Sequence, residues 1–375
     1  MYNNDDIYSA LENVKGPDGV KSLVESGALS GVNIRDGKVF VTIAVDPDQA
    51  AASEPMRLAA ENAVKAIPGV AAAMVVLTSE RKPEASGNGG GHGAQRQMPS
   101  AAPERGVGLE NISKIVAVAS GKGGVGKSTT AANLAIALAR LGLKTGLLDA
   151  DIFGPSLPRL FGIKDRPELS EDGRSLAPLE KFGVKLMSIG FLVEDDAAIV
   201  WRGPMVMSAI TQLLREVAWG QLDVLVVDMP PGTGDVQLTM AQNASLAGAI
   251  IVSTPQDLAL IDARRGIAMF QQVHVPILGL FENMSYFLCP HCGGRSEIFA
   301  HGGARAEAEK FQVPFLGEAP LDMVIREGSD NGLPVLASAP ESDQAKPYLA
   351  LAERVRDALA QSAKEASRKP KFVVG

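Results

Sequence analysis

The chain has 375 residues and a mass of 39.2 kDa, which favours two domains, or one large domain with an appendage, over a single compact domain. Its 36 basic and 43 acidic residues give a net charge of −7, which argues against a protein that binds nucleic acid by neutralising many phosphates. The two cysteines are too few for a disulfide-stapled secreted scaffold. Because the sequence starts without a secretory signal pattern and no apolar run approaches the roughly 20 residues of a membrane span, we expect a cytoplasmic protein with neither a nucleic-acid nor a membrane partner.

Residues 1–80 predict a small α+β domain. Its helical and alternating patterns indicate a helix over 7–24, a hairpin over 32–43 turned at Asp36-Gly37, a helix over 54–67 and a strand over 73–77. The segment 81–110 that follows is rich in glycine and proline and predicts a flexible linker.

Residues 111–363 predict an α/β domain of the P-loop NTPase class, because strands alternate with helices as they do around a mostly parallel sheet covered on both faces. Buried strands are expected over 115–119, 145–148, 185–189, 224–227, 249–252 and 277–281. A final helix is expected over 347–360, and residues 364–375 form a basic tail.

A phosphate-binding loop is the clearest motif of this domain. It lies between a predicted strand and a predicted helix and reads Gly121-Lys122-Gly123-Gly124-Val125-Gly126-Lys127-Ser128-Thr129. The glycines let backbone N–H groups approach phosphate oxygens, Lys127 can reach the β- and γ-phosphates, and the Ser128 hydroxyl can ligate Mg²⁺. Asp228 ends an apolar strand before the Gly-rich turn Met229-Pro230-Pro231-Gly232-Thr233-Gly234-Asp235, which predicts a carboxylate beside Mg²⁺ at the end of the strand.

With Lys122 next to its first glycine, the loop resembles the deviant Walker A motif of the MinD and ParA class of dimerising ATPases. The resemblance implies that Lys122 reaches the partner's nucleotide, with a solvated loop-tip lysine as the alternative. It implies that Asp151 orients the attacking water and that Asn283 contacts the base, although Asn283 fits a simple turn asparagine equally well. No guanine-recognition signature is present, which favours ATP as the nucleotide.

The two cysteines form one pair, Cys289-Pro290-His291-Cys292, whose spacing suits a metal knuckle or a redox dithiol. Structural zinc and most iron-sulfur clusters take four ligands, and the chain has no third cysteine. If the chain forms a two-fold dimer, two copies of the pair complete the set. The sequence therefore favours half a metal site in each chain.

The motifs together are similar to those of the Mrp/ApbC family of P-loop iron-sulfur cluster carriers. Besides the loop, the segment from Asp228 to Asp235 and the cysteine pair, the similarity rests on three segments, Trp201-Arg202-Gly203-Pro204-Met205, Glu282-Asn283-Met284-Ser285-Tyr286-Phe287 and Leu316-Gly317-Glu318-Ala319-Pro320-Leu321-Asp322. It implies an ATP-hydrolysing homodimer that shares a labile [4Fe-4S] cluster on Cys289 and Cys292, receives the cluster from a donor or scaffold protein and delivers it to apo-proteins. We expect the turn after Asp228 to couple the γ-phosphate to the cysteines.

Residues 1–80 resemble, less strongly, the iron-sulfur-assembly domain often fused before such carriers. That domain often has a cysteine before its second helix, whereas residues 45–53 of this chain contain no thiol. Residues 1–80 therefore cannot bind a cluster through a cysteine of their own, and we expect them to dock a partner or to regulate the protein.

Two other functions fit parts of the pattern. A MinD/ParA-like positioning ATPase would share the nucleotide site but gives the cysteine pair no role. The same dimer with a structural zinc would use the pair as a knuckle.

Overall fold

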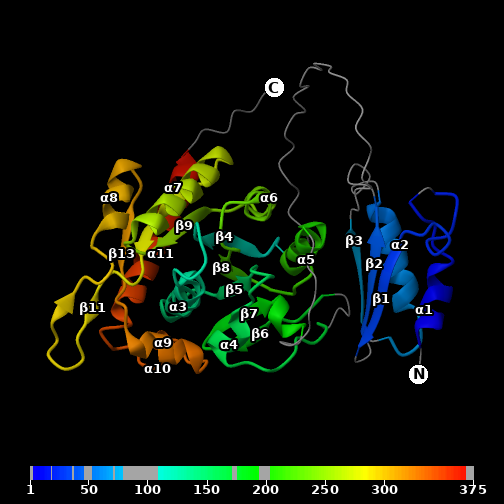
Figure 1. The fold of residues 1–375 in the computed structure, drawn as a ribbon, viewed down its shortest axis with the longest axis horizontal. Helices are drawn as coiled ribbons and strands as arrows, with labels where there is room; N and C mark the ends of the chain where they lie inside the picture. The colour runs from blue at the N-terminus through cyan, green and yellow to red at the C-terminus, as the bar shows by residue number, and fades with distance from the viewer. Residues whose placement is uncertain are drawn as a thin grey trace, which may run out of the picture. The chain divides into compact units, whose positions relative to one another are not determined.

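The computed structural model describes residues 3–17, 19–35, 38–45, 53–70, 72–78, 109–170, 175–193 and 203–368. They belong to two compact units, a small one near the N-terminus and a large one that contains the phosphate loop (Figure 1). Nearly all of the predicted linker, the turn at Asp36-Gly37 and the end of the predicted tail lie outside the described residues.

The small unit is a three-stranded sheet with two helices. Its elements are α1 (Asn4–Leu11), β1 (Leu29–Arg35), β2 (Lys38–Ala44), α2 (Glu54–Lys65) and β3 (Ala72–Thr78). The strand order is β1-β2-β3, with β1 and β2 antiparallel and β2 and β3 parallel. Apolar side chains from the sheet and both helices, among them Ile7, Val41 and Val64, form its core.

The first helix is shorter than the sequence pattern predicted. It ends at Leu11, and the chain then folds back on itself so that Leu23 donates its N–H to the Val14 carbonyl at 2.7 Å. Pro17 has no N–H to donate to a helix, and Gly16 bonds across the turn to Lys21. The prediction of one helix over 7–24 is therefore wrong.

The large unit is built on an eight-stranded sheet in the order β13-β10-β9-β4-β8-β5-β7-β6. Its strands are β4 (Ile112–Ala119), β5 (Thr145–Asp149), β6 (Leu179–Lys181), β7 (Val184–Ser188), β8 (Leu222–Asp228), β9 (Gly248–Ser253), β10 (Ile277–Glu282) and β13 (Phe315–Glu318). Every neighbouring pair is parallel except β6 and β7. The predicted mostly parallel α/β fold is confirmed, and the antiparallel edge strand β6 is an addition that the sequence did not reveal.

Helices cover both faces of this sheet (Figure 1). The helices after residue 109 are α3 (Lys127–Arg140), α4 (Leu157–Phe161), α5 (Gly203–Arg215), α6 (Asp235–Asn243), α7 (Asp257–Gln272), α8 (Gly303–Lys310), α9 (Met323–Asp330), α10 (Val335–Ser338) and α11 (Lys346–Arg368), with a 3-10 turn at Ile189–Phe191, and the first half of α5 groups with the small unit. α3 and α11 pack together against the sheet core, α7 packs on β9, and α8 packs on β10. α11 runs to Arg368, beyond its predicted end. Among the described residues, no helix is both long and apolar enough to cross a membrane.

Parallel pairing brings the carboxyl ends of the central strands to one edge of the sheet. The phosphate loop follows β4, and Asp149 and Asp228 are paired residues at the ends of β5 and β8. On the other side of β4, β10 ends at Glu282 and leads into a two-stranded hairpin, β11 (Phe287–Leu288) and β12 (Arg295–Ser296), which carries the cysteines. The fold thus places both predicted sites after strands of one sheet.

Candidate nucleotide site and cysteine hairpin

The phosphate loop has a backbone that only glycine tolerates at its last turn. Gly126 has φ +82°, and a Cβ there would collide with the side-chain nitrogen of Asn283. A Cβ on Gly121 would collide with the backbone of Asp262 on α7. The loop is therefore held between two neighbouring segments, and it leads directly into the N-terminus of α3, where free N–H groups attract anions.

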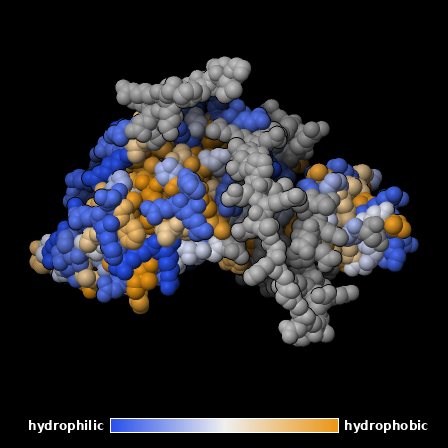
Figure 2. Space-filling model, turned by 90° about the horizontal axis from the view of Figure 1, so that it is seen from above, coloured by the Kyte–Doolittle hydropathy of each residue, from blue (hydrophilic) through white to orange (hydrophobic). Residues whose placement is uncertain are grey.

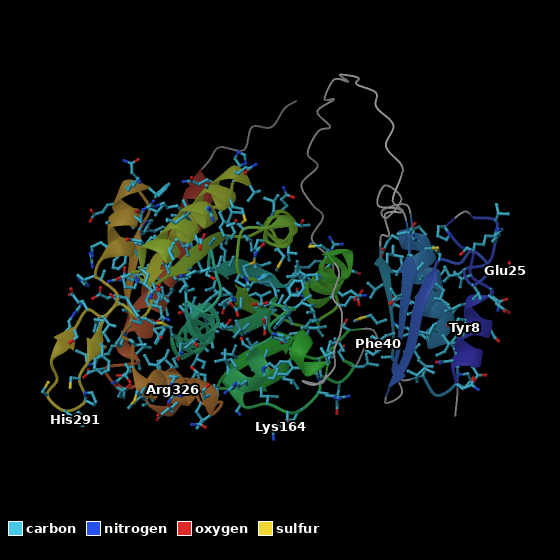
Figure 3. All side chains as sticks on the ribbon, in the orientation of Figure 1. Tyr8, Glu25, Phe40, Lys164, His291 and Arg326 are labelled. Carbon is cyan, nitrogen blue, oxygen red and sulfur yellow. The ribbon has the colours of Figure 1, made fainter. Side chains whose placement is uncertain are left out.

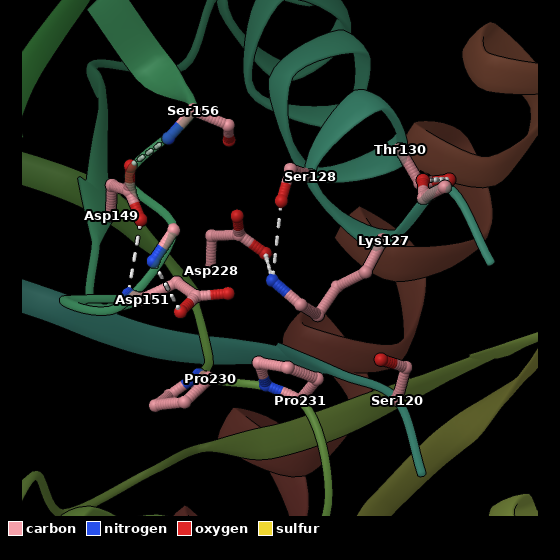
Figure 4. Close-up of polar contacts among 12 residues, drawn as sticks. Ser120, Lys127, Ser128, Thr130, Asp149, Asp151, Ser156, Asp228, Pro230 and Pro231 are labelled. Atoms are coloured by element: carbon pink, nitrogen blue, oxygen red, sulfur yellow. Dashed lines mark hydrogen bonds and ion pairs between the residues drawn. The ribbon is translucent and has the colours of Figure 1, made fainter. Parts of the chain in front are cut away.

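Lys127 and Asp228 form a buried ion pair at the centre of the site (Figure 4). The Lys127 Nζ lies 2.5 Å from Asp228 Oδ1 and 3.2 Å from the Ser128 hydroxyl. The side chains are 6% and 0% exposed, respectively. In this state the loop lysine neutralises the carboxylate that the sequence assigned to Mg²⁺.

The donor set fits a magnesium ion. The second oxygen of Asp228, Oδ2, is buried and has no hydrogen-bond partner among the described residues. The Ser128 hydroxyl and this carboxylate are hard oxygen donors of the kind that Mg²⁺ prefers, and both adjoin the Lys127 ammonium. An unpaired buried oxygen is costly unless a cation or donor completes it, so these two residues could hold the ion.

Asp149 is a residue of this site that the sequence reasoning did not select. Its carboxylate is fully buried and accepts hydrogen bonds from the Ser188 hydroxyl and from the backbone N–H groups of Asp151, Ser156 and Leu157. Burial and, after it, the neighbouring Asp228 charge raise the pKa of Asp149 to about 7, against the opposing charge of Lys127. The sequence signal that could have identified Asp149 is its position as a carboxylate at the end of a buried strand.

Asp151 is oriented by its neighbour rather than by the phosphate loop. Its N–H donates to Asp149 at 3.0 Å, and its carboxylate accepts the N–H of Gly154 at 3.3 Å. The side chain is half-buried, and burial raises its pKa against the opposing charge of Lys127. Its predicted role in orienting water stays a prediction.

The turn after Asp228 is fixed by Gln237, which the sequence reasoning also did not single out. The buried amide of Gln237 donates to the carbonyls of Pro230 and Pro231 at 3.1 and 2.5 Å. Gly232 donates its N–H to the Ser120 carbonyl at the start of the phosphate loop. These bonds join the turn to the loop and to α6.

The other residues predicted to bind the nucleotide differ in how exposed they are. Gly123 and Gly124 are exposed, Val125 is buried, and Lys122 and Thr129 are half-buried. Their predicted nucleotide contacts, like the reach of Lys122 across a dimer, stay predictions.

Asn283 lies against the phosphate loop. It is buried, and its Nδ2 donates to the Val125 carbonyl at 2.9 Å. Asn283 therefore helps to hold the loop in place. Its predicted contact with a base stays a prediction.

The cysteine pair sits on the exposed β11–β12 hairpin, at whose outer turn Figure 3 labels His291. Cys289 is half-buried and Cys292 is exposed, and both are free thiols. Two backbone hydrogen bonds close the turn. The Cys289 N–H donates to the Gly294 carbonyl at 2.9 Å, and the Gly293 N–H donates to the Cys289 carbonyl at 2.8 Å.

The turn favours a thiolate at its first cysteine. Hydrogen bonds from the backbone N–H groups of Cys292 and His291 lower the pKa of Cys289 below its usual value. A thiolate is the metal-binding form of cysteine, so the turn prepares one of its two sulfurs for a metal.

Comparison with known proteins gives the family. The family model ParA, described as NUBPL iron-transfer P-loop NTPase, matches residues 111–356. The chain belongs to this family. The small unit matches a second family model, iron-sulfur cluster assembly protein, over residues 4–75. The resemblances drawn from the sequence motifs are thereby confirmed for both parts of the chain.

Members of the family and a solved structure are similar over different shares of the chain. An iron-sulfur protein required for NADH dehydrogenase, mitochondrial, of Arabidopsis thaliana is 58% identical over 248 residues, which are 66% of this chain and 79% of the relative. An iron-sulfur cluster carrier protein of Synechocystis sp. is 41% identical over 367 residues, 97% of this chain and 99% of the relative. The nucleotide-binding protein of Archaeoglobus fulgidus in complex with ADP has a TM-score of 0.56 and 42% identity over 63% of this chain and 92% of its own.

Proposed function

We propose that the chain is an ATP-hydrolysing carrier that holds a [4Fe-4S] cluster between two subunits and transfers it to apo-proteins. The observation that carries this proposal is the exposed hairpin with two free thiols, which follows β10 of the sheet whose strand β4 leads into the phosphate loop. Relatives named as iron-sulfur cluster carriers support the choice of cargo.

The nucleotide site supplies the ATPase half of the proposal. The loop N–H groups and Lys127 would bind the phosphates, and Ser128 and Asp228 would hold Mg²⁺, which would neutralise phosphate charge when bound. To take up that ligand, Lys127 must leave Asp228, from which it is 2.5 Å away. Asp151 would orient the attacking water, and Asp149 would hold the Asp151 segment in place.

The homodimer is proposed from ligand number and from the surface around the loop. A cluster that takes four thiolates needs two copies of this hairpin, because the chain has two cysteines. Gly121 abuts Asp262 of α7, and Leu258 and Ile261 on this helix, like Phe153 near Asp151, are exposed apolar side chains. Figure 2 shows hydrophobic residues among the hydrophilic ones on one face of the molecule. Exposed apolar groups beside a nucleotide site suit a subunit contact.

The small unit is proposed to dock a partner or to regulate the carrier, as a domain of residues 1–80 joined by the linker 81–110. Ser53 is the N-cap residue of α2 and ends the segment 45–53, in which related domains often carry a cysteine and this chain has none. A cluster donor or a recipient protein is the partner that this role would require.

Anaerobic reconstitution with iron and sulfide tests the cargo. We expect absorbance near about 400 nm and about four iron atoms per two chains. Cys289→Ser and Cys292→Ser should lose both signals, whereas His291→Ala, on the same turn, should keep them. Equal iron binding by Cys289→Ser would refute the proposal, and zinc without iron in protein purified without oxygen would replace it with a structural zinc site.

Delivery to an apo-enzyme tests the link to the nucleotide. The Lys127→Ala variant should retain the cluster but deliver it more slowly than the unaltered chain. Delivery at an unchanged rate would show that transfer does not depend on the nucleotide site.

A further inference from the structure

The cysteine hairpin has little support of its own. Each of its strands has two residues, and every residue from Pro290 to Ile298 is exposed. Hairpins of this size are marginally stable in water unless another part of the protein holds them. Whatever fixes the cysteines must therefore come from contacts at the base of the hairpin.

Arg295 makes the side-chain contacts there, beside a backbone bridge in which the Leu321 N–H donates to the Tyr286 carbonyl at 2.7 Å. Arg295 is paired with Leu288, the residue before Cys289, across the two strands. Its guanidinium lies 4.0 Å from the centre of the Tyr286 ring and donates to Glu318 Oε1 at 3.2 Å. The arginine side chain is 40% exposed and that of Glu318 is 23% exposed, so the pair is only partly screened by water.

Glu318, the last residue of β13, in turn adjoins buried polar side chains at the end of β10. The Ser285 hydroxyl lies 2.6 Å from Glu282 Oε1 and 3.3 Å from Glu318 Oε2, and its single hydrogen can serve either carboxylate. Glu282 is fully buried, and its other oxygen accepts the N–H of Ala304 in the first turn of α8 at 2.7 Å. The Ser285 hydroxyl thus joins the two carboxylates, and Arg295 supplies a positive charge to Glu318.

The same strand end holds the phosphate loop. Asn283, next to Glu282, donates to the Val125 carbonyl and lies so close to Gly126 that a Cβ there could not be accommodated. A shift of the loop must therefore move Asn283, and with it the end of β10. The turn after Asp228 is bonded to Ser120 and Gln237 instead, so the contacts favour β10 as the link to the cysteines.

We propose that Arg295 is a positioning residue for the cysteine pair, and that Glu318, Ser285 and Glu282 connect it to Asn283 and the phosphate loop. The inference rests on the proposed function, because only a cluster carrier needs positioned cysteines, but it can be tested on the protein without iron. Glu282, His301 and Glu318 could also suggest a cation site, since their donor atoms lie within 4.8 Å of one another. The Arg295 guanidinium, 3.2 Å from both Glu318 and His301, already provides the positive charge there.

Hydrogen exchange of the full, iron-free chain tests the inference without using the cluster. In Arg295→Ala and Glu318→Gln, we expect amides over 287–296 to exchange at least about fivefold faster than in the unaltered chain. A non-hydrolysable ATP analogue with Mg²⁺ should slow this exchange in the unaltered chain and not in the variants. Arg305→Ala is the matched control, because Arg305 stacks on Phe315 at 4.4 Å on a neighbouring helix.

Two results would refute the positioning role of Arg295 or its connection to the phosphate loop. Hairpin exchange in Arg295→Ala equal to that in the unaltered chain would refute the positioning role, and Arg295→Lys should restore protection only partly because it loses the planar stacking group. An unaltered chain whose hairpin does not respond to the nucleotide analogue would refute the connection to the loop. Iron content after reconstitution, measured separately, reports on the proposed function, so the two failures are distinguishable.

Discussion

The buried pair between Lys127 and Asp228 should be a measurable source of stability in the nucleotide-free protein. The two charges are 2.5 Å apart and their side chains are 6% and 0% exposed. Removing one partner leaves the other buried without compensation, which costs about 3 to 5 kcal/mol in the free energy of unfolding. Lys127→Met should reach this range, because it leaves Asp228 facing Asp149, whose pKa the Asp228 charge already raises.

Asp228→Asn should cost less, about 3 kcal/mol, because Lys127 keeps the attraction of Asp149. The double variant should recover much of the loss, since it leaves no uncompensated charge from the pair. We therefore expect a coupling energy of at least about 2 kcal/mol in the double-mutant cycle.

Urea unfolding in the presence of a chelator and without nucleotide provides the assay. The chain has two tryptophans, so a Trp201→Phe background leaves the fully buried Trp219 as the reporter of the large unit. Additive costs, with a coupling below about 0.5 kcal/mol, would refute the reasoning that the pair is closed in the free protein.

Three further predictions follow from the site geometry. Asp149→Asn removes the titration of a carboxyl whose pKa is raised from 3.8 to about 7 by burial and then by the Asp228 charge. Because the folded chain holds this proton more tightly than the unfolded chain, the free energy of unfolding of the unaltered chain should fall by up to about 4 kcal/mol relative to that of Asp149→Asn from pH 4 to 7 and then level off; a constant difference between the two proteins would contradict the shift. Gly126→Ala should abolish binding of a fluorescent ATP analogue while Gly123→Ala keeps most of it, because a Cβ at position 126 collides with the Asn283 amide and a Cβ at position 123 meets open space; equal binding by the two variants would show that Asn283 does not constrain the loop. Alkylation followed by peptide mass analysis should modify Cys289 faster than Cys292 near pH 7 in metal-free protein, because the turn amides lower its pKa, and the reverse order would contradict the thiolate assignment.

Local patterns were sufficient to predict the parts of the site that lie in one stretch of chain. The glycines and Lys127 follow a buried strand, and Asp228 ends another, so both could be recognised by their position alone. The first helix was overextended because apolar spacing continued past Gly16 and Pro17, where the backbone turns back.

Residues whose role depends on distant neighbours could not be predicted in this way. Asp149 is a buried carboxylate beside a second one only because the strand register pairs it with Asp228. Arg295 meets Glu318 only because the chain after β10 runs beside the chain after β13, where Ser285 donates its N–H to the Ala319 carbonyl. Neither contact leaves a periodic signal in the sequence.

The central claim is that one [4Fe-4S] cluster joins two copies of this chain through Cys289 and Cys292. Native mass measurement of the anaerobically reconstituted protein tests it most directly, because it weighs the chains and the cargo in one particle. We predict that the mass of one cluster is found on a particle of two chains and is absent from Cys289→Ser. A cluster carried by single chains, or zinc in place of iron on the dimer, would contradict the account.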